Sequence, residues 1–243
     1  MRQKKVKTIL ITGASRGLGL ALARAVALSG WNLILDGRDP AALEAARLEL
    51  AKSTLVQAIA GDVSDPNHRA ALRAAVEQAG GLDALVNNAS TLGASPLPAL
   101  LEYPLDIYER VLKVNLIAPL ALLQAVHAHF HPNPVVINVT SDAGIEAYEG
   151  WGGYGSSKAA LERMSAILAA ENPAWRVYWV DPGDMRTRMH QEAFPGEDIS
   201  DRPLPEVSIP GLLTLLAGKF PSGRYQARNV GQAENEISSR VGG

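Results

Sequence analysis

The 243-residue sequence predicts an α/β fold in which helices surround a buried parallel sheet. Two observations support this prediction. Short apolar runs of strand length alternate with longer alanine- and leucine-rich segments of helical period, and capping residues stand where those segments begin and end. The apolar runs occupy residues 6–11, 32–35, 55–60, 84–86, 135–139 and 177–180.

The first helices have clear start and stop signals. Asp39 and Asp65 each stand directly before a proline, so a capping carboxylate precedes a residue suited to the first helical position. Gly30 and the pair at 80–81 stand where two of these helices should end. Later helices are expected over 105–130, 154–170 and 209–220, and a brief last strand over 223–227.

The chain shows no internal repeat and no flexible linker, so residues 1–243 are expected to form one domain. Residues 188–210 are rich in proline and acidic residues and have little periodicity, which predicts a long surface loop beside the substrate. Residues 229–243 are polar and are expected to form a tail.

Composition excludes several classes of function. Lys and Arg number 23 and Asp and Glu 25, a net charge of −2, so no basic surface for nucleic acid is expected. The absence of cysteine excludes disulfides and thiolate chemistry, and it favours a cytoplasmic location. The basic start at 2–7 precedes too short an apolar run for a signal peptide, and the apolar stretch 116–126 is too short to span a membrane.

A glycine-rich turn follows the first expected strand. Residues 12–19 read TGASRGLG and lead directly into an alanine-rich helical segment. Glycines at such a junction allow a sharp turn and a close approach of the backbone to a pyrophosphate, whose charge suits the free N–H groups of a helix start. The turn therefore predicts a nucleotide site.

The tip of the second strand bears on which nucleotide binds. In a doubly wound fold this tip faces the adenosine ribose, where a carboxylate accepts from a 2′-hydroxyl and an arginine pairs with a 2′-phosphate. Asp36 and Arg38 compete for that place, and Arg16 in the glycine turn is able to reach the same phosphate. Two arginines on one dianion favour NADP(H).

A second group of residues predicts acid–base chemistry. Tyr154 and Lys158 have i, i+4 spacing on an expected helix, so they lie on one face about one turn apart. A neighbouring ammonium favours the phenolate and should lower the pKa of the tyrosine. Ser141 follows the apolar run 135–139, at the carboxyl end of a strand, where open α/β sheets bind ligands.

Taken in order along the chain, these motifs resemble those of the classical short-chain dehydrogenase/reductase family, from Thr12 to about Tyr225. The matching residues are Gly13, Gly17 and Gly19 of the glycine motif, Asp62 and Val63 after the third strand, Asn87, Asn88 and Ala89 after the fourth, then Asn115, Ser141, Tyr154, Lys158, Pro182, Gly183 and Thr187. Two positions depart from the family pattern, Ser90 where glycine is usual and Asp181 where asparagine is common.

The resemblance implies a Rossmann-like, doubly wound sheet of seven strands with helices on both faces. It also implies hydride transfer between a nicotinamide cofactor and a carbonyl compound or secondary alcohol. Tyr154 would be the general acid or base, Ser141 would donate to the substrate oxygen, and Lys158 would lower the pKa of Tyr154 and hold the nicotinamide ribose. Asn115 would hold a water that links Lys158 to solvent.

The resemblance further implies a cofactor site. Its expected residues are Gly13, Ser15, Arg16, Gly17, Leu18, Gly19, Arg38, Asp62, Val63, Asn88, Ala89, Tyr154, Lys158, Pro182, Gly183 and Thr187. The position that usually carries the NAD-selecting acid aligns with Gly37, and alternation turns Asp36 away from the ribose. We therefore expect NADP(H), with NAD(H) as the alternative.

Further predictions concern the substrate, metals and assembly. Asp142, Tyr148, Trp151 and Asp184 are expected at the substrate pocket. No metal site is expected, because the i, i+4 pair of His127 and His131 lacks any HExxH context and reads as a surface pair on a helix that Pro132 ends. The family commonly pairs through the helices that here span 105–130 and 154–170, so a homodimer or homotetramer is expected.

Two alternative functions stay open. The first is a nucleotide-binding regulator or scaffold without turnover, whose sign would be a broken Ser, Tyr or Lys, and all three are present. The second is an epimerase or dehydratase on the same fold, since a fold does not by itself determine the chemistry.

Overall fold

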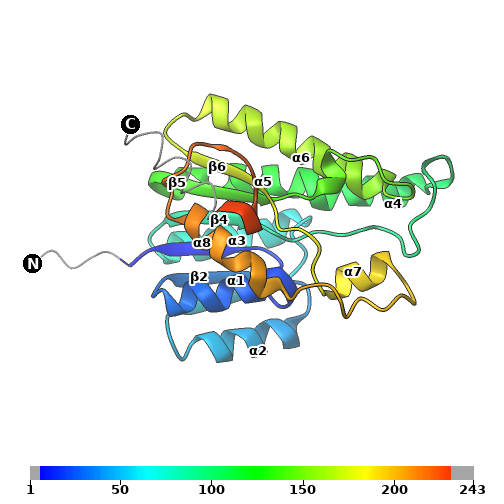
Figure 1. Ribbon diagram of the computed structural model, residues 1–243. Helices are drawn as coiled ribbons and strands as arrows, with labels where there is room; N and C mark the ends of the chain where they lie inside the picture. Colours follow the sequence, from blue (N-terminus) through cyan, green and yellow to red (C-terminus); the bar gives the residue numbers. More distant parts are fainter. Residues whose placement is uncertain (1–5, 231–243) are drawn as a thin grey trace, which may run out of the picture.

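A sheet of seven parallel strands forms the centre of the computed structural model, which describes residues 6–230 (Figure 1). The strand order is β3-β2-β1-β4-β5-β6-β7, so the chain winds outward first to one side of β1 and then to the other. This is the doubly wound, Rossmann-like arrangement that was predicted. The strands are β1 (Thr8–Ile11), β2 (Asn32–Gly37), β3 (Val56–Ala60), β4 (Leu82–Asn87), β5 (Phe130–Val139), β6 (Arg176–Asp181) and β7 (Gly223–Gln226).

The sheet is buried on both faces, as alternation along β1 shows. Ile9 and Ile11 belong to one hydrophobic core and Leu10 to the other, and all three are inaccessible to solvent. A strand covered on both sides reads as a continuous apolar run, which explains why the strands were recognisable in the sequence.

Helices form a layer on each face of the sheet (Figure 1). Their bounds are α1 (Gly17–Leu28), α2 (Pro40–Leu50), α3 (Pro66–Gln78), α4 (Leu105–Leu112), α5 (Ala118–Val126), α6 (Gly152–Glu171), α7 (Arg188–Ala193) and α8 (Ile209–Leu216). α1, α2 and α8 contribute to one core, and α3 and α5 to the other, while α6 packs along β6 and against α4. The three-layer arrangement that was expected is therefore present.

The predicted helix signals act as expected. The carboxylate of Asp39 accepts from the N–H of Ala42 at 3.1 Å, and that of Asp65 accepts from the N–H of Asn67 at 2.9 Å. Gly30 has a φ of +77° directly after α1, the left-handed conformation in which many helices end.

The expected helix 105–130 is a continuous helical segment, Leu105–His129, interrupted by a π-helical turn, Lys113–Ile117. Within the described residues it is the one helix long and apolar enough to cross a membrane. Its apolar side contributes Leu122, Leu123 and Val126 to a core, so packing in this fold accounts for that composition. The helix ends earlier than predicted, because residue 131 already lies on β5.

The expected loop 188–210 is more ordered than predicted. It begins with α7, whose first turn is capped by the Thr187 hydroxyl, which accepts from the N–H of His190 at 3.3 Å. A 3₁₀ turn, Pro205–Ser208, then leads into α8. The basic start and most of the expected tail, residues 1–5 and 231–243, lie outside the described residues.

Candidate active site

The glycine turn, residues 12–19, joins β1 to α1 and has the backbone that its composition predicts. Gly13 has a φ of +65° and Gly17 a φ of +55°, values that residues with a Cβ rarely adopt. A Cβ on Gly19 would lie 2.4 Å from the main-chain oxygen of Gly13. Only glycine at 19 therefore lets the turn fold back onto the helix start.

The start of α1 fits a dinucleotide pyrophosphate. Arg16 at the N-cap makes no side-chain capping bond, and the first turn of this 12-residue helix holds no acidic residue. The N–H groups of the first turn and the positive end of the helix dipole therefore suit an anion. Ser15 lies in the same turn, whereas the side chain of Leu18 is in the core, so Leu18 has only its main chain for a ligand.

The end of β4 clamps the glycine turn. The amide of Asn88 donates to the main-chain oxygens of Thr12 at 2.8 Å and Gly13 at 3.1 Å. The hydroxyl of Thr12 accepts from the N–H groups of Asn88 and Ala89, both at 3.0 Å. The side chain of Asn88, expected at the cofactor, thus shapes the turn that would hold it.

Asp36 faces the protein interior, as strand alternation predicted. It is 2% exposed, and its Oδ2 accepts from the N–H of Gly13 at 3.2 Å. Its Oδ1 lies 2.5 Å from Nε2 of the buried His68 on α3. With both oxygens engaged inside the protein, this carboxylate is not oriented toward a ribose at the tip of β2.

The other residues at the tip of β2 are charged. Arg38 is exposed and lies close enough to Asp62 to affect its ionisation. Burial raises the pKa of Asp62, but hydrogen bonds from Ser64 and the charges of Arg38 and Arg110 outweigh it, so the pKa is lowered. The neighbouring Val63 points into the core, which leaves its main chain for an adenine contact.

Arg16 does not remain free beside Arg38. Its Nη2 lies 3.0 Å from Oδ2 of Asp39 in a half-exposed ion pair. The same carboxylate caps α2 through Oδ1, so Asp39 joins the glycine turn to the helix after β2. Arg16 and Arg38 were both expected to bind one phosphate. In this structure the carboxylate of Asp39 competes with that phosphate for Arg16.

The expected catalytic residues meet at the carboxyl end of the sheet. Tyr154 and Lys158 lie one turn apart on α6, with the Lys158 Nζ 5.3 Å from the centre of the Tyr154 ring. Ser141 follows the end of β5, and its hydrogen bond to Tyr154 acts to lower the pKa of that phenol. The three residues that the sequence singled out therefore form one cluster.

Burial dominates the ionisation of Tyr154 and Lys158. Burial raises the pKa of Tyr154, with hydrogen bonds from Ser90 and Ser141 acting in the opposite direction. Burial lowers the pKa of Lys158 to about 7. The amine of Lys158 donates to the main-chain oxygen of Val139 at 2.8 Å, and the expected lowering of the pKa of Tyr154 by Lys158 stays a prediction.

Asn115 lies in the π-helical turn, and its side chain is fully engaged within the protein. Its Nδ2 donates to the main-chain oxygen of Thr91 at 2.9 Å and to the Ser157 hydroxyl at 3.0 Å. Its Oδ1 accepts from the N–H of Thr91 at 2.9 Å and from the Ser90 hydroxyl at 3.1 Å. The side chain thus fixes the loop after β4 against α6, and a water contact of the expected kind would need another atom of Asn115.

A mostly buried ionic group lies beside Ser141. Arg224 of β7 donates through Nε to Glu162 of α6 at 3.0 Å and through Nη2 to the main-chain oxygen of Ser141 at 3.3 Å. The same Nη2 is 3.6 Å from Oδ2 of Asp181, the residue that replaces the family's asparagine. Burial raises the pKa of Asp181, and a hydrogen bond from Gly183 acts against it. The cluster ties three strands and α6 together around Ser141.

The segment after β6 connects the catalytic cluster to the glycine turn. Gly183 has a φ of +73°, and its N–H donates to Oδ1 of Asp181 at 2.8 Å. A Cβ built on Gly17 would lie 3.7 Å from the Thr187 methyl carbon, which places Thr187 beside the glycine turn. Pro182, Gly183 and Thr187 all line the active-site cavity, as expected of the residues that flank a nicotinamide.

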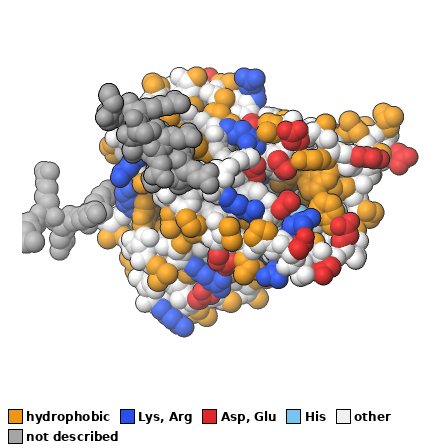
Figure 2. Space-filling model, viewed as in Figure 1, with side chains coloured by type: hydrophobic (Ala, Val, Ile, Leu, Met, Phe, Trp, Pro, Cys, Tyr) orange, Lys and Arg blue, Asp and Glu red, His pale blue; other side chains and the backbone are white. Residues whose placement is uncertain are grey.

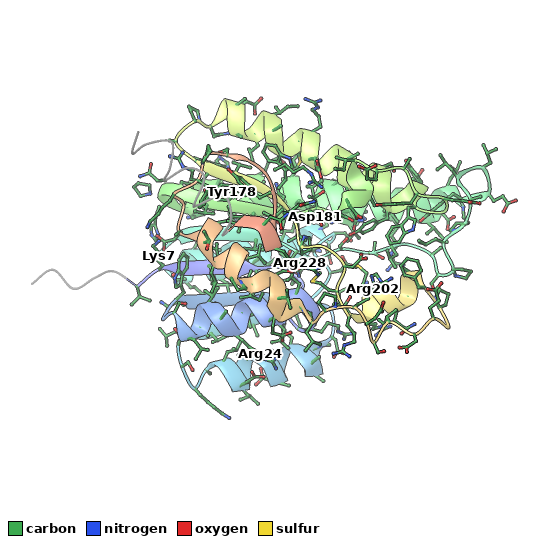
Figure 3. The ribbon with its side chains drawn as sticks, in the orientation of Figure 1. Lys7, Arg24, Tyr178, Asp181, Arg202 and Arg228 are labelled. Carbon is green, nitrogen blue, oxygen red and sulfur yellow. The ribbon has the colours of Figure 1, made fainter. Side chains whose placement is uncertain are left out.

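The active-site cavity has a volume of about 270 Å³ and opens between the loop that follows Ser141 and the segment of α7. Tyr154 and Ser141 line it, and so do all four residues expected at the substrate, which are Asp142, Tyr148, Trp151 and Asp184. Figure 3 shows Asp181 at the carboxyl end of the sheet and Arg202 in the segment after α7. Residues expected at the substrate, in catalysis and at the nicotinamide therefore line one cavity.

Three functional candidates were missed in the sequence. Glu162 repeats the i, i+4 spacing of Tyr154 and Lys158, and that spacing was a usable signal. The sequence held no usable signal for His68 or Arg224, because their partners Asp36 and Glu162 are 32 and 62 residues away in the chain.

No metal centre is present in the part of the chain that the structure describes, where no three His, Asp or Glu side chains gather in a suitable group. The expected surface pair of His127 and His131 does not share a helix, since His131 lies on β5 and pairs with Asp83 at 3.2 Å.

Comparisons with known proteins agree with this geometry. A family model described as short chain dehydrogenase matches residues 7–198. A short-chain dehydrogenase/reductase of Cladobotryum is 35% identical over 170 residues, which cover 68% of this chain and 64% of that protein. Benzil reductase ((S)-benzoin forming) of Saccharomyces cerevisiae is 32% identical over 198 residues, 76% of this chain and 74% of that one.

Solved structures are similar over almost the whole chain. A putative short chain dehydrogenase from Pseudomonas syringae has a TM-score of 0.86 at 31% identity, and the alignment covers 92% of this chain and 95% of that one. A short chain dehydrogenase from Shigella flexneri, solved in complex with NADP, has a TM-score of 0.85 at 28% identity, with 91% and 97% covered.

Proposed function

The chain belongs to the short-chain dehydrogenase family of oxidoreductases, and from this premise we propose that it transfers a hydride between NADP(H) and a carbonyl compound or secondary alcohol. The observation that carries the proposal is that Ser141 and Tyr154 line one cavity together with Gly183 and Thr187, while Lys158 lies one turn from Tyr154 on α6. Acid–base residues beside the segment expected to hold a nicotinamide are what such a reaction requires.

Tyr154 is the proposed proton donor in the reducing direction. Its raised pKa keeps the phenol protonated at neutral pH, and its hydroxyl lies within hydrogen-bonding range of Ser141 and Ser90. When bound, NADPH supplies the hydride that goes to the carbonyl carbon. The Tyr154 proton then goes to the carbonyl oxygen, so that a secondary alcohol and the oxidised cofactor result.

Ser141 is the proposed second donor to the substrate oxygen. Its hydroxyl donates to Oδ1 of Asp142 at 2.8 Å and accepts from the N–H of Ala143 at 3.2 Å. These partners hold the hydroxyl at the cavity, and donating to a substrate oxygen requires it to turn away from Asp142. A donor aimed at the oxygen stabilises the negative charge that develops there.

Lys158 is the proposed partner of both Tyr154 and the nicotinamide ribose. With a pKa of about 7, its amine changes between ammonium and neutral amine close to physiological pH. It is therefore able to pass a proton toward Tyr154 after each turnover. We expect Lys158→Met to lose both rate and cofactor affinity, because one amine serves both roles.

The preference for NADP(H) rests on the tip of β2. Asp36 is engaged by Gly13 and His68, and Arg38 is exposed beside it. The family neighbour from Shigella flexneri was solved with NADP, which supports a nicotinamide dinucleotide of this kind. Arg38 and Arg16 would meet the 2′-phosphate, and Gly13, Ser15 and the start of α1 would hold the pyrophosphate.

The proposal is tested by a screen of carbonyl compounds and secondary alcohols with NADPH, NADH and their oxidised forms, in which the absorbance of the reduced nicotinamide is followed. Turnover that depends on Tyr154 supports the proposal. Tight nucleotide binding without turnover of any compound would favour a regulator instead, and a product isomerised or dehydrated without net oxidation would favour an epimerase or dehydratase.

We also propose a homodimer or homotetramer, formed through the helical segment Leu105–His129 and α6. Ile117 and Ile167 are 54% and 50% exposed on these helices, although Leu161, expected on the same surface, is buried in the core. Light scattering at micromolar concentration tests the assembly, and a monomer would contradict it. A cytoplasmic location stays a proposal for fractionation experiments.

A further inference from the structure

The charged side chains that line the active-site cavity all carry the same sign. Among the described residues of its wall these are Asp142, Asp181 and Asp184, and neither lysine nor arginine is one of them. Figure 2 shows acidic side chains gathered around the apolar surface on the right of the molecule, where α7 lies in Figure 1. A ligand in this cavity therefore meets carboxylates and no lysine or arginine, and the histidine of the described wall, His190, accepts a hydrogen bond from Nε of Arg202 at 3.3 Å.

The arginines nearest to the cavity do not neutralise it. At its mouth, Arg202 lies 3.8 Å from Asp184 through Nε but only 2.6 Å from Asp201 through Nη1. Asp184 is 60% exposed, and His190 is 3.9 Å away. Arg228, also near, donates to the main-chain oxygen of Asp184 and does not line the cavity. One cation is thus shared between two carboxylates.

The same sharing occurs at the inner end. Arg224 is bound to Glu162 at 3.0 Å and lies 3.6 Å from Asp181, so a single guanidinium again faces two carboxylates. Asp142 has no cationic partner among the described ion pairs, and its oxygens accept from Ser141, Ala143 and Tyr148. Carboxylates are therefore present in the wall at both ends of the cavity, and each nearby guanidinium of Arg202 and Arg224 is shared with a carboxylate outside the wall.

The phenol of Tyr148 at the mouth responds to this field. The pKa of Tyr148 is raised by its hydrogen bond to Asp142 and by the charge of Asp142, and the charges of Glu146 and Asp184 add to the effect. The carboxylates of Asp142, Glu146 and Asp184 therefore all act on one point of the cavity wall.

Aromatic rings form another part of the wall. The Trp151 ring centre lies 6.4 Å from that of Tyr148, 5.7 Å from that of Tyr154 and 5.9 Å from that of Phe194. Such rings offer a flat apolar surface, and their faces also attract cations. Aromatic faces next to carboxylates are the combination that recognises ammonium groups.

We propose that the substrate is a carbonyl compound, or the corresponding secondary alcohol, whose flat apolar body carries a positive charge such as a protonated or quaternary amine, and this rests on the proposed function. The ring system packs on Trp151 and Tyr148, and the cationic group faces Asp184 at the mouth. Anionic compounds of the same shape are rejected, because no cation on the wall meets them. Asp184 is thus a specificity-determining residue.

The experiment compares three ketones of one shape and different charge. These are 4-acetyl-N,N,N-trimethylanilinium, which is cationic, 4-tert-butylacetophenone, which is its neutral isostere, and 4-acetylbenzoate, which is anionic. Their dissociation constants are measured by calorimetry with the full chain and NADP⁺, and then their kcat/KM with NADPH. We expect the cation to bind about tenfold or more tightly than the anion, with the neutral ketone between them.

Two variants should move this preference in opposite directions. Asp184→Asn removes a carboxylate and should reduce the ratio of cation to anion affinity by about three- to tenfold. Arg202→Gln removes the shared guanidinium and should increase the ratio. Glu171→Gln makes the same charge change as Asp184→Asn at the far end of α6 and should leave the ratio as it is.

The binding and turnover arms separate the two hypotheses. Equal affinities for the three ketones, or tighter binding of the anion, would overturn the charge preference even if all three are reduced. Preferential binding of the cation that Asp184→Asn weakens supports the preference even if no ketone is reduced, in which case the proposed reaction is the hypothesis that fails.

Discussion

His68 on α3 reaches the carboxylate of Asp36 on β2 at 2.5 Å, and the other oxygen of that carboxylate holds the N–H of Gly13. The pair is buried, and a Cβ on Gly61 would lie 2.3 Å from Nδ1 of His68, so the imidazole packs directly on the backbone after β3. The glycine turn is therefore supported from the protein interior by two side chains, Asp36 and His68, that are not themselves expected to contact the cofactor.

Removing His68 should weaken NADPH binding even though no residue expected to contact the cofactor is changed. His68→Ala leaves one oxygen of a buried carboxylate without its partner, which should lower the free energy of unfolding by about 1–3 kcal/mol. The loosened turn should also weaken NADPH binding several-fold. Urea denaturation and fluorescence titration measure the two effects, with His127→Ala on the exposed last turn after α5 as the control. Unchanged stability and affinity in His68→Ala would refute this support of the glycine turn.

Tyr154→Phe tests the proposed proton donor. The substitution removes one hydroxyl and keeps the ring that packs against Trp151, so the fold and nucleotide binding should be retained. Loss of a general acid should lower kcat by about 10²–10⁴-fold. Steady-state rates and the NADPH dissociation constant are compared with those of Tyr148→Phe, whose hydroxyl lies at the cavity mouth. Near-normal turnover by Tyr154→Phe would exclude the assigned mechanism.

Lys158 should make stability depend on pH. Its pKa is about 7 in the folded protein against 10.5 in the unfolded chain, because burial disfavours the ammonium. Between these values the unfolded state binds the extra proton, so stability should rise with pH by at most about 1.4 kcal/mol per unit. Below pH 7 both states are protonated and the full penalty of burial applies.

Lys158→Met should remove this contribution. Urea denaturation at pH 6, 7.5 and 9 gives the free energy of unfolding of both proteins, and the difference between them isolates the lysine from other titrating groups. We expect the free energy of unfolding of the variant minus that of the parent to be largest at pH 6 and smallest at pH 9. Parallel curves for the two proteins would show that Lys158 stays charged in the folded state.

The order of elements was predictable, since each depended on local sequence. Strands buried on both faces appear in the sequence as unbroken apolar runs. Asp39 and Asp65 are N-cap residues that directly precede α2 and α3, so they indicate where these helices begin. Segments with weak local signals were less predictable. α7 was read as a loop because a helix of six residues has too few turns to show a period, and its cap comes from Thr187 before it.

The candidate site divides in the same way. Tyr154 and Lys158 are related by helical spacing, and Ser141 by the end of a strand, so they were found. Contacts between distant segments, such as that of Arg224 with Glu162, depend on strand order. The sequence around either residue does not indicate them. The raised pKa of Tyr154 was not predicted, because its largest cause is burial, which a sequence does not quantify.

Arg224 should position Ser141 for the reaction. Arg224→Met leaves Glu162 and Asp181 without their shared cation and removes the donor to the Ser141 main-chain oxygen. We expect a lower free energy of unfolding, by about 3 kcal/mol or more, and a lower kcat with a smaller change in KM. Arg224→Lys keeps the positive charge but lacks the several N–H donors of the guanidinium. Compared with Arg224→Met, it should recover more of the lost stability than of the lost kcat. Equal recovery of both would indicate a purely structural role.

Cofactor choice is predicted to depend on Arg38 more than on Arg16, because Arg16 is already paired. The Arg16 guanidinium lies 3.0 Å from Asp39, whereas Arg38 is exposed at the tip of β2. A charge-assisted hydrogen bond to a 2′-phosphate is worth about 1.5–3 kcal/mol, more than tenfold in affinity. Arg38→Ala should therefore weaken NADPH binding by at least about tenfold and leave NADH nearly unaffected, and Arg16→Ala should have a smaller effect.

Asp39→Asn tests whether Arg16 contributes little to NADPH binding because Asp39 pairs with it. Asparagine caps a helix as well as aspartate does, so the bond to the N–H of Ala42 is kept while Arg16 is released toward the phosphate. The variant should bind NADPH several-fold more tightly than the parent and NADH about equally. Gly37→Asp suits the test less, because a Cβ there would lie 3.2 Å from the Ser15 hydroxyl and disturb the glycine turn. Fluorescence titration with both nucleotides measures the preference, and a parent protein that binds NADH as tightly as NADPH would show that neither arginine meets the phosphate.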